Sequence, residues 1–292
     1  MNFECNLCKS QKKPKIIRSI DMPDRFESQF RRTHKGYERY WVRCAECGAG
    51  VHVMDNETTR IVSEIADKYY DLDLGGLSDL EEKYHRVMGL PDEKSDNAGR
   101  SKRVANWIAD AFSEGKERAV SVCDIGSGLG LFPSKLLKVA VDYNVIIARC
   151  VAVETDPLAF EFSSRFSEFE VRNGFFPDVV PEEMFSVITL NKVLEHIRQP
   201  RDLLKSCLQH LEEGGFLYLE VPCLSNAWLK PDGDDSIQTL HHNLYDVPAL
   251  SRLLSEEGFM VVRAERINEP SGKITTYAFA QRLSDLNLDR AK

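Results

Sequence analysis

The sequence predicts an α/β protein with a mostly parallel β-sheet, preceded by a small cysteine-bearing region. Short apolar, β-prone runs recur between residues 119 and 222, and helical segments separate them. A glycine-rich turn, residues 126–130, joins the first of these runs to a helix. Two Cys-x-x-Cys pairs lie near the N-terminus. These observations indicate a ligand-binding α/β domain with a metal-stapled N-terminal piece.

The glycine-rich turn predicts a cofactor site. The run Ala119–Cys123 is apolar and β-prone, and Asp124 stands at its carboxyl end. Glycines permit a tight turn and a close ligand approach where a Cβ would clash. The following helix, from about Leu131 to Val141, has its N-terminus directed at that ligand. We therefore expect a nucleoside-type cofactor at the carboxyl edge of a parallel sheet. The turn contributes Gly126, Ser127, Gly128 and Gly130.

The spacing of the glycines narrows the choice of cofactor. It reads G-x-G-x-G, and Leu131 stands where the third glycine of a dinucleotide-binding fold would fall. No G-K-[ST] follows, which excludes a P-loop. A second apolar run, Cys150–Glu154, also ends in an acid, one helix and one strand after Asp124. At that interval an acid can bind ribose hydroxyls, so we expect Glu154 to do so with Thr155 beside it. The alternative for Glu154 is a charge at a helix N-terminus before Pro157.

These motifs resemble class I S-adenosylmethionine (SAM)-dependent methyltransferases, whose motif I is an acid followed by G-x-G-x-G. The segments Glu170–Gly174, Phe185–Leu190, Asn191–Ile197 and Glu213–Pro222 resemble the family's later strands and loops. The resemblance covers roughly residues 95–281 and implies a Rossmann-like, seven-stranded sheet that ends in an antiparallel hairpin, Phe259–Arg266 with Ile274–Gln281. It implies that the cofactor is bound by Arg100, Asp124, Gly126, Ser127, Gly128, Gly130, Glu154, Thr155, Asn173, Gly174 and Asn191.

The cysteine pairs predict a zinc site. Cys5 with Cys8, and Cys44 with Cys47, each place two thiolates on one tight turn. Two such turns give a tetrahedral four-cysteine set, whereas two disulfides are a poor alternative in a reducing compartment. His52 is a possible substitute ligand. A closed four-cysteine site is structural, and a piece this small needs such a staple to fold.

The chain divides into three predicted parts. Residues 1–55 form a zinc ribbon, 56–112 a helical connector or lid, and 113–292 the methyltransferase domain. In the connector, Ile61, Ile65, Tyr69 and Tyr70 share one helical face, Asp71–Gly76 interrupts the helix, and Leu77–Met88 resumes it. In related enzymes the end of this region covers the cofactor. Arg100 could bind the methionine carboxylate of SAM in a two-pronged way, or be a surface arginine at a helix start.

Composition and charge restrict the partners. The net charge is −8. Residues 1–60 hold 12 basic against 8 acidic residues, which leaves 26 against 38 in the rest of the chain. An acidic catalytic domain makes nucleic acid an unlikely substrate, although the basic N-terminal piece could favour a phosphate-bearing one or be a solvated loop. No apolar run spans a bilayer and no signal peptide precedes the fold, so we expect a cytoplasmic protein.

Zinc knuckles followed by a SAM domain resemble two groups of enzymes. One comprises bacterial sugar and polysaccharide methyltransferases with an N-terminal zinc-binding domain, and the other comprises zinc-finger ribosomal-RNA methyltransferases. The acidic composition and the absence of an N/D-P-P-Y/F motif favour the first group. So does Leu240–Tyr245, which resembles the E-H-x-x-Y/F segment of the sugar enzymes with His241 in place of Glu. The C-methyltransferases of that group carry a further C-terminal domain, whereas this sequence stops soon after the predicted sheet. We therefore expect O-methylation rather than C-methylation.

The resemblance places three histidines beside the cofactor. A hydroxyl acceptor must lose its proton, and histidine suits that role near neutral pH. His242 is the expected general base, with His241 and His196 next, and Glu220 could bind sugar hydroxyls or orient a histidine. The alternatives are loop histidines bonded to backbone and a salt bridge at Glu220. The leading function is therefore O-methylation of a sugar in a glycan, nucleotide-sugar or glycosylated metabolite. A zinc-finger RNA methyltransferase and a non-catalytic SAM-binding or interaction module are the alternatives.

Overall fold

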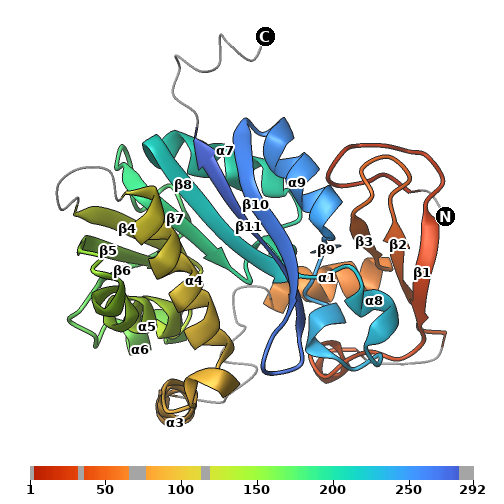
Figure 1. The fold of residues 1–292 in the computed structure, drawn as a ribbon. Helices are drawn as coiled ribbons and strands as arrows, with labels where there is room; N and C mark the ends of the chain where they lie inside the picture. The colour runs from red at the N-terminus through yellow and green to blue at the C-terminus, as the bar shows by residue number, and fades with distance from the viewer. Residues whose placement is uncertain (1–2, 32–35, 66–76, 113–118, 283–292) are drawn as a thin grey trace, which may run out of the picture.

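The fold is built on a seven-stranded sheet and a separate four-stranded sheet (Figure 1). The computed structural model describes residues 3–31, 36–65, 77–112 and 119–282. The large sheet has the order β10-β11-β8-β7-β4-β5-β6. Its first five strands in sequence pair in parallel, and β11 is antiparallel to both β8 and β10. The predicted α/β, Rossmann-like sheet with a final antiparallel hairpin is thus confirmed. The strands are β4 (Val120–Ile125), β5 (Ile147–Glu154), β6 (Glu170–Asn173), β7 (Phe185–Asn191), β8 (Leu211–Pro222), β10 (Phe259–Asn268) and β11 (Ile274–Arg282).

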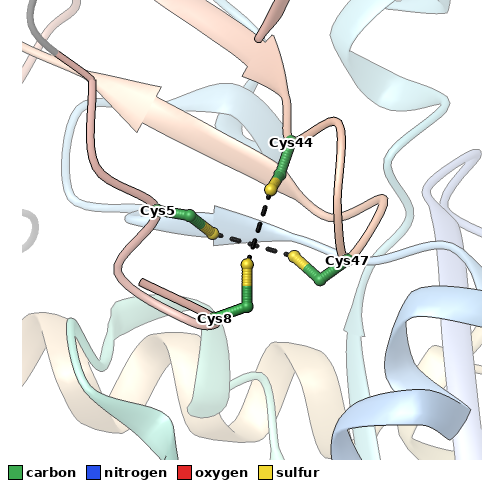
Figure 2. A group of neighbouring side chains, drawn as sticks. All are labelled: Cys5, Cys8, Cys44 and Cys47. Carbon is green, nitrogen blue, oxygen red and sulfur yellow. Dashed lines mark hydrogen bonds between the residues drawn. The ribbon is translucent and has the colours of Figure 1, made fainter. Parts of the chain in front are cut away.

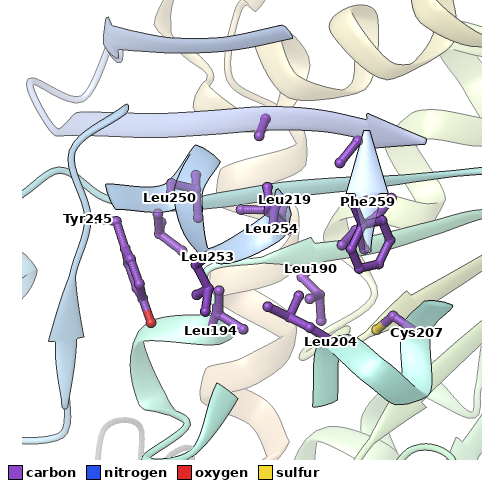
Figure 3. Packing of buried hydrophobic residues seen from close by; sticks show 14 of the residues in the cluster. Leu190, Leu194, Leu204, Cys207, Leu219, Tyr245, Leu250, Leu253, Leu254 and Phe259 are labelled. Carbon is purple, nitrogen blue, oxygen red and sulfur yellow. The ribbon is translucent and has the colours of Figure 1, made fainter. Parts of the chain in front are cut away.

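Helices cover both faces of the large sheet, as its two-sided apolar strands require. On one face α4 (Asp96–Ala111) and α5 (Leu131–Ala140) pack on a cluster that includes Val122. On the other, α7 (Pro200–His210) and α9 (Val247–Glu256) pack on a cluster that includes Cys123 (Figure 3). The remaining α-helices of the described chain are α1 (Asn56–Ile65), α3 (Leu77–Met88), α6 (Pro157–Ser163) and α8 (Asn226–Leu229).

The predicted helical connector agrees with α1, α3 and α4. The predicted segment Leu77–Met88 coincides with α3. Ser95 caps α4, because its Oγ accepts a hydrogen bond from Ala98 N at 3.1 Å. Tyr69, Tyr70 and the predicted break at residues 71–76 lie outside the described residues.

The small sheet joins the N-terminal region to the large domain. It has the order β1-β2-β3-β9 and is antiparallel. Its central N-terminal strand is β2 (Arg39–Arg43), which lies between β1 (Lys15–Ile20) and β3 (Gly50–Val53). The fourth strand, β9 (Asn243–Leu244), comes from the methyltransferase part of the chain. The boundaries at residues 55 and 112 stay a prediction, and β9 shows that the first part does not close its own sheet.

The loop before β9 is held by the N-terminal region through buried polar contacts. Asp24 Oδ2 accepts hydrogen bonds from Thr239 N and Thr239 Oγ1, at 2.5 and 2.6 Å. Arg39 Nη1 donates to Ile237 O at 2.9 Å. His52 bonds twice, with Nδ1 facing His241 O at 2.8 Å and its backbone N donating to His242 O at 3.0 Å. The N-terminal region therefore fixes the segment that carries two of the predicted catalytic histidines.

Short 3-10 turns complete the described elements. They are η1 (Glu27–Gln29), η2 (Asp92–Lys94), η3 (Val141–Tyr143), η4 (Leu194–His196) and η5 (Asp235–Ile237). Two of them, η4 and η5, lie in loops near the carboxyl end of the large sheet and matter for the site below. Of the helices in the described ranges, none has both the length and the apolar character needed to cross a membrane.

Substitution of Gly50 by alanine tests the junction between β3 and β9. A Cβ at residue 50 would lie 2.4 Å from Leu224 Cδ1 and 3.1 Å from Leu244 Cβ. We expect Gly50→Ala to lower the free energy of unfolding by about 1–3 kcal/mol, because added atoms in a packed interior force neighbours apart. Urea denaturation measures this. Gly233→Ala is the control, since a Cβ there meets nothing within 4 Å. Equal stabilities of the two variants would contradict the close packing of this junction.

Candidate active site

A cavity of about 460 Å³ opens at the carboxyl end of the parallel strands. The predicted cofactor residues Gly126, Glu154, Thr155 and Asn191 line it. The predicted catalytic residues His196, His241 and His242 line it too. The structure thus brings residues from both predicted sets to one cavity, whose other polar lining residues are Lys192, Glu195, Asp235, Ser236, Gln238, Lys273 and Thr275.

The glycine turn needs its glycines. Gly126 has φ +67°, and a Cβ there would lie 2.6 Å from Val193 Cγ2. Gly130 has φ +72° and precedes α5, and a Cβ on it would lie 2.7 Å from Phe169 Cζ. Both positions combine a left-handed backbone with close packing, which side-chain-bearing residues tolerate poorly. The turn can therefore pack closely against its neighbours only with glycine at these positions.

Glu154 is tied to the glycine turn by its carboxylate. Oε2 accepts a hydrogen bond from Gly128 N at 2.6 Å, and Oε1 accepts from Thr155 N and Asp156 N, both at 2.8 Å. Asp156, rather than Glu154, caps α6. Burial raises the pKa of Glu154. The carboxylate thus lies at the cavity wall in a fixed orientation, with further acceptor capacity on Oε2.

Asn173 and Gly174 lie behind Glu154. Asn173 Nδ2 and Gly174 N both donate to Glu154 O, at 3.2 and 3.0 Å. Gly174 has φ +137°, and a Cβ there would lie 2.5 Å from Val179 Cγ1. The predicted adenine contacts of these two residues stay a prediction, and the observed contacts give them a role in shaping the end of β5.

Asp124 is buried under the turn and linked to β7. Its Oδ1 accepts hydrogen bonds from Thr189 Oγ1 at 2.6 Å and Asn191 Nδ2 at 2.9 Å. Burial raises its pKa to about 7, although these two bonds act in the opposite direction. Asn191 Oδ1 and Ser127 Oγ are buried without a hydrogen-bond partner among the described residues. Polar atoms in that state suit a bound ligand that supplies the missing partners.

Arg100 points to Glu220 in this structure. Its Nη2 lies 2.8 Å from Glu220 Oε1, and Arg103 Nη2 lies 2.7 Å from Glu220 Oε2. Tyr218 OH also donates to Glu220 Oε2, at 2.5 Å. Burial alone would raise the pKa of Glu220, but Arg100, Lys192 and Arg103 hold it below its usual range. Carboxylate binding by Arg100 stays a prediction.

Glu220 differs from the sequence-based expectation. Its hydrogen bonds to arginine and tyrosine correspond to the salt-bridge alternative, and its side chain is fully buried. It is not among the residues that line the cavity. Hydroxyl binding and histidine orientation were expected of a carboxylate at the end of a strand, but two arginines of α4 reach this one first.

The histidines occupy different environments. His241 is bonded at both ring nitrogens, with Nδ1 facing Ser236 O at 3.0 Å and Nε2 facing Gln238 Nε2 at 3.1 Å. His196 Nδ1 faces Leu240 O at 3.2 Å. The ring of His242 makes no hydrogen bond to any described residue, and burial lowers its pKa to about 4. The neutral His242 ring has a lone pair available at the cavity wall, and its lowered pKa makes it a weaker base than an exposed imidazole.

Sequence reasoning assigned no role to several lining residues. Lys192 follows β7 with a positive φ of 62°, and its Nζ donates to Thr275 Oγ1 at 2.6 Å. Gln238 touches His241, three residues later in the chain. Glu195 is 1% exposed, and burial raises its pKa to about 7. The Leu-Glu-His run was a signal for Glu195, whereas the sequence offers none for Lys192 or Gln238.

The four N-terminal cysteines converge in space (Figure 2). Cys5 Sγ lies 3.7 Å from Cys47 Sγ, and Cys8 Sγ lies 3.6 Å from Cys44 Sγ. All four thiols are free, and their sulfur atoms lie within 4.8 Å of one another. Sulfur atoms around a tetrahedral zinc with bonds of about 2.3 Å are about 3.8 Å apart. The set therefore has the geometry of a closed zinc site. His52 lies elsewhere, stacked on Trp41.

Comparisons with known proteins agree with the fold of the large α/β domain. A family model described as "Methyltransferase domain" matches residues 97–264, more than half of the chain. The chain belongs to this methyltransferase family. Among curated proteins, ubiquinone biosynthesis O-methyltransferase of Schizosaccharomyces pombe is 29% identical over 108 residues. That match covers 34% of this chain and 37% of the relative, so the chain spans little more than a third of that relative's length.

Solved structures resemble the fold of this methyltransferase at low sequence identity. Magnesium protoporphyrin IX methyltransferase from Synechocystis with bound S-adenosylhomocysteine has a TM-score of 0.53 and 13% identity. The match covers 75% of this chain and 99% of that protein. The same enzyme with bound SAM has a TM-score of 0.51 and 12% identity, with 76% and 97% covered. These similarities concern the fold.

Replacement of Glu220 tests the buried charge cluster. We expect Glu220→Ala to lower the free energy of unfolding by about 3–5 kcal/mol, because it removes a fully buried carboxylate and leaves the partly buried Arg100 and Arg103 without the counter-charge they share. Guanidinium denaturation monitored by circular dichroism measures this. Glu64→Ala is the control, since Glu64 also pairs with an arginine, Arg60, but at the surface, and its loss should cost less than about 1 kcal/mol. Similar losses in both variants would contradict a buried cluster.

Proposed function

We propose that this protein transfers a methyl group from SAM to a hydroxyl oxygen of a sugar. The acceptor belongs to a glycan, a nucleotide-sugar or a glycosylated small molecule. The observation that carries the proposal is the single cavity that the glycine turn, Glu154 and three histidines share. Membership in a methyltransferase family supplies the reaction class.

Binding of SAM is supported by the features of the cavity wall. Gly126 and Glu154 both line the cavity, and the Glu154 carboxylate is held against the turn by Gly128 N. Glu154 follows Asp124 by one helix and one strand, the sequence interval at which an acid binds ribose in such folds. Ser127 Oγ and Asn191 Oδ1 are buried polar atoms without partners in the described chain. SAM would be held by these residues, and it supplies an electrophilic methyl group. The same cradle is also consistent with the solved methyltransferase that has SAM bound.

The acceptor side of the cavity favours a polyhydroxylated molecule. It presents imidazole, amide, hydroxyl, carboxylate and ammonium groups, including His242, Gln238 and Lys273. Such groups bind hydroxyls through directed hydrogen bonds. The name of the curated relative, an O-methyltransferase, supports oxygen as the atom methylated.

His242 is the proposed general base. Its ring lines the cavity, has no hydrogen-bond partner among the described residues and is neutral at pH 7 because burial lowers its pKa. It can therefore take the proton of an acceptor hydroxyl as the new carbon–oxygen bond forms. His241 is less suited, since Ser236 O and Gln238 Nε2 occupy both of its nitrogens.

Zinc binding by Cys5, Cys8, Cys44 and Cys47 is part of the proposal. The sulfur separations support it. The role is structural, because four thiolates leave no open position. Cys5 and Cys44 are buried in the same apolar cluster as Tyr245 and Leu250, so the ion would stabilise the region that packs on α9.

The function is tested by methyl transfer from radiolabelled SAM into cell extract, separated into glycan, small-molecule and RNA fractions. We expect label in a sugar-containing fraction, and His242→Ala should lower the rate by about 10²–10⁴-fold because the proton acceptor is lost. The affinity for SAM, measured by calorimetry, should not change in that variant. His85→Ala, at an exposed position of α3, is the activity control.

Two results would overturn this proposal. Label found only in RNA would establish the zinc-finger RNA methyltransferase instead. SAM binding without label in any fraction would favour a non-catalytic module.

Cobalt substitution tests the cysteine site. Thiolate ligands give Co²⁺ an intense charge-transfer absorption in the near ultraviolet, which nitrogen and oxygen ligands do not. We expect this band in the wild-type protein reconstituted with Co²⁺ and its loss in Cys47→Ser, together with a lower thermal midpoint. Cys150→Ala, which removes a buried thiol outside the cluster, should keep the band. A wild-type protein without the band would refute the site.

A further inference from the structure

We propose that Glu195, His196 and His241 bind a divalent transition-metal ion inside the acceptor cavity. This site is separate from the four-cysteine set. The three residues come from η4 and from the loop before β9, and each of them lines the cavity. One ligand atom from each lies within 4.8 Å of the other two. Two imidazoles and one carboxylate form a ligand set suited to Zn²⁺ or Fe²⁺.

Glu195 provides the observation that points to a ligand. Its side chain is 1% exposed, and Oε2 has no hydrogen-bond partner in the described part of the chain. The nearby cation does not pair with it, since Lys192 Nζ bonds to Thr275 Oγ1 and lies 3.7 Å from Glu220 Oε1. A buried carboxylate oxygen without a partner is costly, and a metal ion removes that cost.

Both histidines have the orientation of metal-bound imidazoles. His196 Nδ1 faces the backbone oxygen of Leu240 at 3.2 Å, and His241 Nδ1 faces that of Ser236 at 3.0 Å. A proton on Nδ1 that is donated to a carbonyl puts the lone pair on Nε2, the tautomer that binds metals. The two rings meet edge to face, with centroids 4.6 Å apart.

Gln238 completes the surroundings of the site. Its Nε2 faces His241 Nε2 at 3.1 Å, and its Oε1 is buried without a partner among the described residues. Rotation of the amide releases His241 Nε2 and presents an oxygen in its place. Ligand atoms that bind one metal ion at about 2.1 Å lie about 3.4 Å from one another. The three ligand atoms lie within 4.8 Å of one another here, so small side-chain rotations bring them to that separation.

Three protein ligands leave the ion an open position. That position faces the cavity, where it would take an acceptor hydroxyl and make its proton easier to remove. This consequence rests on the proposed function. The metal site itself does not, and it is tested without SAM or acceptor, so failure of one proposal is distinguishable from failure of the other.

The experiment measures bound Co²⁺ per chain in the full-length protein after dialysis, by mass spectrometry, with near-ultraviolet absorption to separate the two sites. We expect two ions per wild-type chain, of which only one gives thiolate charge transfer. Glu195→Gln and His241→Ala should each lower the affinity for the second ion at least about 10-fold. Mutation of residues that only support metal ligands already lowers metal affinity by about 10-fold or more. Cys47→Ser should lose only the first ion.

His242→Ala is the matched control, because it removes a neighbouring cavity histidine that is not in the ligand set, and it should keep both ions. Thermal unfolding and SAM affinity show whether a ligand variant remains folded. One ion per wild-type chain would overturn the site, as would a second ion bound equally well by wild type and by folded Glu195→Gln.

Discussion

The pairing of β3 with β9 is the contact on which the acceptor side of the cavity depends. It spans only Gly50 with Leu244 and Val51 with Asn243, yet it anchors the loop that carries His241 and His242. The buried hydrogen bonds of Asp24, Arg39 and His52 to residues 237–242 continue the same junction. A loop without them would lose backbone partners that a buried segment requires. The N-terminal sheet region therefore acts as the supporting wall of the cavity.

The two sides of the cavity are stabilised by different kinds of contact. On the cofactor side, backbone amides at Gly128, Thr155 and Asp156 fix Glu154, and left-handed glycines keep the wall bare. On the acceptor side, side chains and carbonyls from separate loops meet, so the orientation of each ring depends on distant parts of the chain. The first arrangement is local in sequence and suits a shared cofactor. The second can vary with the acceptor.

That difference explains how much could be predicted. The parallel strands, the glycine turn and α3 follow from apolar periodicity and turn chemistry, which are local signals. The final antiparallel hairpin followed from the family resemblance. The spacing of the two Cys-x-x-Cys pairs predicted that the four cysteines lie together. The partner of Arg100 could not be foreseen, because Glu220 lies 120 residues away and α4 brings a second arginine to it. Nor could β9 be foreseen, because a strand of two residues forms only by pairing with the edge of β3.

The sheet shared between the two ends of the chain also sets an order of assembly. The ring of His52 faces the carbonyl of a residue 189 positions later. During synthesis β1, β2 and β3 leave the ribosome long before β9 exists, so the edge of β3 stays open while the rest is made. Exposed strand edges invite pairing with other chains. Protection of this edge of β3 therefore depends on the late arrival of β9, and a chain interrupted before residue 243 would expose the edge to pairing with other chains.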